Sequence, residues 1–346
     1  MTSDTDEITD EQSQPPEAKL GSASEERARV LLVGLPRSGT TLVATLLAAQ
    51  PGIVFLTDYF SSFREAQVRL QRTWTDTLDL TEKRIALALV RDQFLRARQL
   101  VLVKPDDFVT LDELHRAVLG ELGSATTRTV GHKLLLPAED LERVLEQTEI
   151  RCLLMVRDPR DAALSYFHRT GGGVEHYLDG WSTTVRAAHR LRHHPRLLSL
   201  RFEDLIADPG ATVGRLGRWL GQELTRDVPQ LRFSRSAAHG SLAWNENSAF
   251  QDVSSRFDKR PVGRWRSQPS SSLIRYAGWA TRRELPLFGY EPSRADPLSR
   301  RERLEFASLR SLYRSERNLR RGLDQSTAWL RGHLPRLRPT NAKTEA

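Results

Sequence analysis

The chain has 346 residues, of which 39% are hydrophobic and 28% charged. These proportions are typical of a globular protein, and the length is sufficient for one large domain or two ordinary ones. The single cysteine, Cys152, excludes an intrachain disulfide framework and a cysteine-based zinc cluster. The 52 basic and 44 acidic residues leave a net charge of +8, which suits an anionic ligand.

The chain divides into three regions by composition. Residues 1–27 are acidic and poor in bulky apolar side chains, so we expect a disordered tail. Residues 28–295 should form the folded body, and residues 296–346 a basic helix and tail. The N-terminus lacks the positive charge and apolar stretch of a signal peptide, and no apolar run reaches the length of a membrane span. We therefore expect a cytoplasmic protein without integral membrane association.

Short apolar runs along the body predict strands, and leucines at helical spacing predict helices. The predicted strands cover residues 29–33, 52–56, 129–136, 151–156 and 197–202. The predicted helices cover residues 39–49, 80–100, 110–122 and 209–220, and two more begin at Pro137 and Pro159. This alternation predicts the α/β class, with a parallel sheet flanked by helices. Residues 237–272 lack clean periodicity, and such a long irregular segment is usually functional or mobile.

A glycine-bearing loop, residues 34–41, lies between the first predicted strand and its helix. Backbone N–H groups in such a loop, together with the helix N-terminus, form a cradle for phosphate. The spacing of Gly34 and Gly39 matches the nucleotide-binding P-loop, but Thr40 stands where that loop has a lysine. The cation is instead Arg37, inside the loop. This arrangement suits a ligand without a γ-phosphate.

A second candidate site follows the strand predicted over residues 151–156. Arg157 lies at the carboxyl end of that strand, where ligands of open α/β sheets bind, and Ser165 lies two turns into the next helix. A guanidinium and a hydroxyl are a suitable pair for a phosphate group. Taken alone, Arg157 could equally form a salt bridge with Asp158 or Asp161. The phosphate loop upstream favours the binding role.

The two motifs together resemble those of sulfotransferases that use 3′-phosphoadenosine-5′-phosphosulfate (PAPS), most closely the bacterial and tyrosylprotein branches. The resemblance covers residues 30–266 and implies the sulfotransferase fold, a P-loop-containing parallel sheet flanked by helices, for the domain 28–295. It implies that the 5′-phosphosulfate is bound by Arg37, Ser38, Gly39, Thr40 and Thr41. It implies that Arg157 and Ser165 hold the 3′-phosphate. Residues 259–266 resemble the family's cofactor-closing segment, with Lys259 and Arg264 as clamps on that phosphate.

The same resemblance implies the catalytic groups, Lys133, Arg37 and a carboxylate, and requires no metal. Several branches carry a lysine at the position of Lys133, where it would act on the leaving group. The histidine that cytosolic members use as base is replaced by Leu135. In the tyrosylprotein branch the catalytic carboxylate follows the loop arginine by 21 residues, which from Arg37 leads to Asp58 (58 − 37 = 21). His132 is the alternative base, although in a strand it would point away from Lys133.

Other functions stay open at this point. A P-loop kinase or another phosphotransferase shares the strand–loop–helix arrangement, although Thr40 argues against it. A nucleic-acid-binding protein would suit the sequence pI near 10.0, yet no recognisable binding module is present, so we expect no nucleic-acid partner. A non-catalytic nucleotide-binding protein is also compatible with the two motifs. The sequence does not identify the sulfate acceptor, which could be a small molecule, a carbohydrate or a natural product, nor the oligomeric state.

Overall fold

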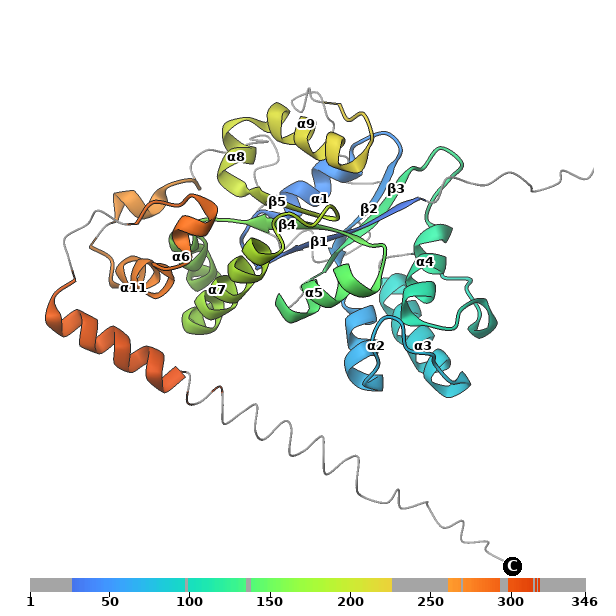
Figure 1. Ribbon diagram of the computed structural model, residues 1–346, viewed down its shortest axis with the longest axis horizontal. Helices are drawn as coiled ribbons and strands as arrows, with labels where there is room; N and C mark the ends of the chain where they lie inside the picture. Colours follow the sequence, from blue (N-terminus) through green and yellow to red (C-terminus); the bar gives the residue numbers. More distant parts are fainter. Residues whose placement is uncertain are drawn as a thin grey trace, which may run out of the picture.

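A parallel sheet of five strands, in the order β2-β3-β1-β4-β5, forms the centre of the molecule (Figure 1). The computed structural model describes residues 27–96, 99–134, 138–225, 261–268, 270–292 and 298–313, with 315 and 317. The strands are β1 (Ala28–Gly34), β2 (Ile53–Tyr59), β3 (Thr129–Leu134), β4 (Arg151–Val156) and β5 (Leu197–Arg201). The expected parallel sheet is therefore confirmed, and all five carboxyl ends lie at one edge.

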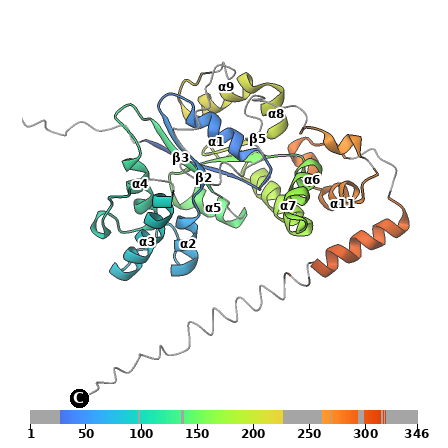
Figure 2. The same cartoon turned by 180° about the vertical axis from the view of Figure 1, so that it is seen from behind.

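Helices cover both faces of this sheet (Figures 1 and 2). One face carries α1 (Thr40–Ala48), α8 (Phe202–Ala207) and α9 (Pro209–Leu220), and the other carries α5 (Ala138–Gln147) and α7 (Val174–Arg190). The helices α2 (Ser62–Leu70), α3 (Leu80–Arg96) and α4 (Leu111–Glu121) form a lobe beside β2 and β3. At the opposite end, α6 (Pro159–Thr170) packs on α11 (Ser272–Thr281).

The core lies in two layers because successive side chains of a strand point to opposite faces. In β1, Leu31 and Val33 belong to the cluster that α4, α5 and α7 complete. Val30 and Leu32 belong to the cluster on the face of α1 and α9. Burial on both faces explains why the central strands are continuous apolar runs.

Most of the predicted strands and helices are present, and the structure adds helices that the sequence did not predict. Asp158 caps α6 by accepting a hydrogen bond from the Arg160 amide, and Pro159 is its first residue, as the sequence indicates. The helices α2, α7, α8 and α11 were not predicted. The second strand continues to Tyr59, beyond the predicted end at residue 56, so Asp58 lies inside β2 and not after it.

The C-terminal region is described over residues 298–313, where a helix covers 300–313. Phe306 of this helix packs edge-on against Tyr276 of α11. The acidic tail and the expected continuation of the basic helix toward residue 330 lie outside the described residues, apart from Arg27 and residues 315 and 317.

Across the part of the chain that the structure describes, no helix combines the length and the apolar character needed to cross a membrane.

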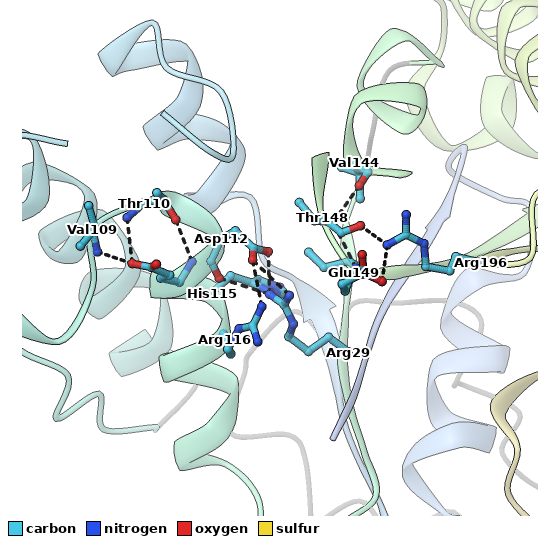
Figure 3. Close-up of polar contacts among 12 residues, drawn as sticks. Arg29, Val109, Thr110, Asp112, His115, Arg116, Val144, Thr148, Glu149 and Arg196 are labelled. Carbon is cyan, nitrogen blue, oxygen red and sulfur yellow. Dashed lines mark hydrogen bonds and ion pairs between the residues drawn. The ribbon is translucent and has the colours of Figure 1, made fainter. Parts of the chain in front are cut away.

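A buried polar cluster, here called the Arg29 cluster, connects β1 to α4 (Figure 3) and, through His132, reaches β3. Arg29 forms an ion pair with Asp112 at 2.8 Å, and one of its guanidinium nitrogens lies 3.3 Å from Nδ1 of His115. Nε2 of His115 lies 3.0 Å from Nε2 of His132. A guanidinium can only donate, so His115 carries its proton on Nε2 and donates it to His132. Each charge in the cluster therefore has a partner within the protein.

Candidate active site

The phosphate loop, residues 34–41, turns the chain from the carboxyl end of β1 into the start of α1. Gly39 is the N-cap of α1 with φ 91°, and no side chain caps this helix end. A Cβ atom on Gly39 would lie 2.4 Å from the ring of Phe202, and one on Gly34 would lie 2.8 Å from the carbonyl oxygen of Met155. Both glycines are thus required for the close approach of the loop to β4 and α8. The amides of the first turn of α1 remain available to an anion.

Arg37, Arg157 and Ser165 come together beside this loop, although they come from three different segments. Nε of Arg37 donates to Oγ of Ser165 at 2.9 Å. A guanidinium nitrogen of Arg157 donates to the carbonyl oxygen of Arg37 at 3.0 Å. The two phosphate motifs predicted from the sequence are therefore adjacent in space.

Arg157 is only 6% exposed, yet it is not paired with an acid. Its guanidinium lies 4.6 Å from the ring centre of Phe202 and donates to the carbonyl oxygens of Arg37 and Pro261. Its Nε is buried and finds no hydrogen-bond partner among the described residues. No carboxylate in the described ranges is within ion-pair distance of Arg157, so the salt bridge with Asp158 or Asp161 considered above is not formed.

Lys133 supplies a cation to the start of α1 from the neighbouring strand β3. It is 4% exposed, and its ammonium group donates to Oγ1 of Thr41 at 3.2 Å. Thr40 is buried at the position where a P-loop has its lysine. Ser38 donates its hydroxyl to the carbonyl oxygen of Leu35 at 2.6 Å, which braces the loop from inside.

Asp58 lies where the pairing of β2 with β3 becomes irregular. The register shifts between Leu56 and Tyr59, and Tyr59 pairs with Lys133. Such bulges are common beside active sites, where they redirect the chain. The backbone of Asp58 is therefore next to that of Lys133 at the carboxyl edge of the sheet.

His132 lies away from this group, on the other face of β3. It is fully buried against Phe60 and Phe63, and burial lowers its pKa to about 4. Its Nδ1 faces the carbonyl oxygen of Lys133 at 3.4 Å. The structure thus separates His132 from Lys133, as the alternation along a strand predicts.

Residues 261–268 lie against the N-terminal turn of α6. Arg264 is exposed and begins the short 3₁₀ helix η3 (Arg264–Ser267), whereas Lys259 lies outside the described residues. The sequence interpretation missed how α6 holds this segment. Arg160, in this turn, is 1% exposed and paired with Asp158 at 2.7 Å. The sequence pointed to Asp161 only as a possible salt-bridge partner of Arg157, and nothing in the local pattern indicates its contact with residues 263 and 265.

Comparisons with known proteins agree with this geometry. A model of the Sulfotransferase family matches residues 29–226, which is more than half of the chain. The sulfotransferase domain of the Synechococcus PCC 7002 olefin synthase is 18% identical with a TM-score of 0.51, over 81% of this chain and 99% of that one. The sulfotransferase domain of the curacin biosynthetic pathway is 16% identical with a TM-score of 0.49, over 77% and 99%. A mouse sulfotransferase, SULT7A1, in complex with PAP is 16% identical with a TM-score of 0.41, over 76% and 89%.

The first of these structures shows the fold, and the family match covers both phosphate motifs. A comparison with curated proteins gives no significant sequence match. The chain therefore belongs to the sulfotransferase family, has the sulfotransferase fold and is a transferase. The family predicted from the two motifs is confirmed, and the kinase alternative is not supported.

Proposed function

We propose that this sulfotransferase moves a sulfuryl group from PAPS to a hydroxyl or amine of an acceptor that is a small molecule, a carbohydrate or a natural product. The observation that carries the proposal is the buried guanidinium of Arg157, which has no acidic partner among the described residues and stands beside the phosphate loop. A cation kept in such a place is stabilised best by an anion that comes from solution.

The residues around the phosphate loop fit the two anionic groups of this nucleotide. The uncapped start of α1 supports binding of the 5′-phosphosulfate by the backbone of Gly39, Thr40 and Thr41, with Ser38 and Arg37 in the same loop. Arg157 and Ser165 are assigned to the 3′-phosphate, and the orphaned Nε of Arg157 supports that role. Arg264 and Lys259 are proposed to add positive charge from the segment that follows.

The chemistry is assigned to Lys133, Arg37 and Asp58. When bound, PAPS supplies a sulfuryl group on a phosphate leaving group. Lys133 and Arg37 would supply positive charge to that leaving group, and because Lys133 is buried its interaction would be stronger than in water. The carboxylate of Asp58 takes the proton of the acceptor hydroxyl. The backbone of Asp58 next to Lys133 supports this pairing.

Asp58 is preferred to His132 as base because of where His132 lies. The ring of His132 is sealed among aromatic side chains on the far face of β3 and is hydrogen-bonded to His115. A base must reach the acceptor proton directly or through one water molecule. Two other acids, Asp106 and Asp107, lie in the 3₁₀ helix η1 (Pro105–Asp107), and Asp107 caps it by accepting from the Lys104 amide at 2.6 Å.

Titration calorimetry with adenosine 3′,5′-bisphosphate (PAP), run beside Mg·ATP, tests the proposed function. We expect the bisphosphate to bind without a metal and more tightly than ATP. A ligand at 100 times its dissociation constant adds about 2.7 kcal/mol to stability, so a thermal shift gives a second readout. Binding of Mg·ATP alone would assign the loop to a phosphotransferase and remove the roles of Arg157 and Ser165.

A further inference from the structure

Residues 261–265 are held beside the start of α6 by two side chains, Arg157 from the link between β4 and α6 and Asp161 from the first turn of α6. Arg157 donates to the carbonyl oxygen of Pro261 at 2.6 Å. Asp161 accepts hydrogen bonds from two backbone amides of the segment, that of Gly263 at 2.6 Å and that of Trp265 at 2.8 Å. The partners are about a hundred positions apart in sequence, so these contacts fix a long-range approach and not a local turn.

The two amides that Asp161 holds belong to the residues on either side of Arg264. Its Oδ2 binds the amide before Arg264 and its Oδ1 the amide after it. The backbone position of Arg264 is therefore set by this one carboxylate. The side chain of Arg264 is exposed, so it is available to a ligand, and it lies three residues after Pro261, whose carbonyl oxygen binds Arg157.

Asp161 is itself unsuited to touch an anionic ligand, and its surroundings explain why it is present. It is 2% exposed, and burial is the main influence on its pKa, which is raised. The amides of Trp265 and Gly263 and the charge of Arg157 act in the opposite direction and favour the carboxylate. Both oxygens are thus occupied by the backbone of the segment, and the negative charge is used to hold that backbone.

Trp265 reinforces the attachment. Two guanidinium groups pack on its ring, that of Arg160 at 3.6 Å from the ring centre and that of Arg266 at 4.6 Å. Arg160 is buried and anchored by an ion pair with Asp158, so the stacking surface is rigid. The segment is therefore held at its backbone by Asp161 and at its side chain by Arg160.

We propose that Asp161 is a positioning residue that holds Arg264 toward the 3′-phosphate of the nucleotide, and so sets the preference for nucleotides that carry this phosphate. The inference rests on the proposed function, because it assumes that a 3′-phosphate binds at Arg157. Asp161 does not contact the nucleotide. It acts through the backbone of the segment, and its loss lowers the affinity for the 3′-phosphate while the 5′ end of the nucleotide keeps its contacts.

The test compares PAP with adenosine 5′-monophosphate, which lacks the 3′-phosphate, by titration calorimetry on the full chain. For Asp161→Asn, which keeps the shape but loses the charge, we expect the dissociation constant for the bisphosphate to rise about tenfold. The constant for the monophosphate should change by less than about twofold. Asp208→Asn is the matched control, because Asp208 also accepts a backbone amide, that of Ala211 at 2.8 Å, at the start of α9. It should change neither constant.

A double-mutant cycle with Arg264→Ala shows whether Asp161 acts through Arg264. We expect the double variant to bind the bisphosphate about as weakly as Arg264→Ala alone, since the carboxylate has nothing left to position. Asp161→Glu, which keeps the charge but moves both oxygens, provides a second variant if the asparagine variant does not fold, and should give the same selective loss.

Three outcomes would overturn the inference. They are an unchanged affinity for the bisphosphate in both Asp161 variants, an equal loss for both nucleotides, and fully additive effects with Arg264→Ala. A wild-type chain that does not bind the bisphosphate would instead remove the proposed function, so the two failures are distinguishable.

Discussion

Two buried arginines show different uses of a charge removed from water, one near the amino end of β1 and one just after the carboxyl end of β4. Arg29 in β1 is 5% exposed and paired with Asp112, and His115 lies beside it (Figure 3). His132 continues the cluster through its hydrogen bond with His115. Arg157, after β4, is 6% exposed and hydrogen-bonds only to backbone carbonyl groups among the described residues. A buried charge is costly unless it is paired. The charge of Arg29 is neutralised within the protein, whereas Arg157 needs an anion from solution as its ionic partner.

The largest expected effect tests whether chemistry occurs at the carboxyl edge of the sheet. Asp58→Asn should lower turnover by roughly 10²–10⁴-fold, the usual contribution of a general base. The affinity for PAP should stay the same, because Asp58 is not assigned to nucleotide binding. Single-turnover assays with radiolabelled PAPS, once an acceptor is found, check the rate. Unchanged turnover would exclude Asp58 from the site.

A large effect on stability is expected at the Arg29 cluster. Among the described residues, Arg29→Met leaves the carboxylate of Asp112 with the half-exposed Arg116, 3.4 Å away, as its one ionic partner. We expect the free energy of unfolding to fall by about 3 kcal/mol, near the lower limit for breaking a buried pair. Urea denaturation measures this loss. The folded variant should still bind PAP as tightly as the wild type. A loss of PAP affinity without a loss of stability would contradict the structural role given to Arg29.

The same substitution at Arg157 should weaken PAP binding strongly and change the free energy of unfolding little, the reverse of Arg29→Met. Arg157→Met removes a charge-assisted contact to the nucleotide, so the dissociation constant for PAP should rise about tenfold to a hundredfold. Two hydrogen bonds to carbonyl groups are lost, but the cost of burying an unpaired charge is removed as well. The free energy of unfolding should therefore change by about 2 kcal/mol or less. Intact affinity with strong destabilisation would make Arg157 a structural residue.

A pH dependence should separate the two regions further. Burial lowers the pKa of His132 to about 4 and that of His115 well below its usual value. Between about pH 6.5 and 4 the unfolded chain therefore binds more protons than the folded one, and stability falls as the pH drops. His132→Gln should lose part of this dependence, so its stability should approach that of the wild type at low pH. Urea denaturation at pH 7.5, 6 and 5 compares them, and parallel curves would contradict the assignment.

The smallest expected effect concerns the contact between β3 and α1. Thr41→Val keeps the shape of the side chain but removes the hydroxyl that accepts a hydrogen bond from Lys133. Losing one such bond costs about 0.5–1.5 kcal/mol, so turnover should fall by about threefold to tenfold. Thr45→Val in the same helix is the control, because its hydroxyl donates to the carbonyl oxygen of Thr41, a bond within the helix. An equal effect of both substitutions would mean that the contact serves folding alone.

The sequence predicted the sheet and both phosphate motifs because their signals are local. Continuous apolar runs identify the buried strands. Gly34 marks the end of β1, and Gly39 and the Asp158–Pro159 pair mark the starts of α1 and α6. Arg157 could be placed because it directly follows a strand whose carboxyl end must lie at the ligand edge.

The contacts that complete the site could not be predicted, because they join segments far apart in the chain. The attachment of Gly263 and Trp265 to Asp161 depends on how α6 meets a segment about a hundred residues later. The burial of Arg160 depends on the Trp265 ring that covers it. The extension of β2 to include Asp58 arises from its pairing with β3, which overrides the weak strand signal after residue 56.

Hydrogen–deuterium exchange with and without PAP tests the central claim most directly, because it reports both regions in one experiment. The account predicts slower exchange over residues 34–41, 157–165 and 261–268 when the nucleotide is added. It predicts unchanged exchange over residues 111–118, which contain Asp112 and His115 of the Arg29 cluster. Protection confined to the Arg29 cluster, or none at the phosphate loop and after β4, would contradict the assignment of Arg157 to a bound anion.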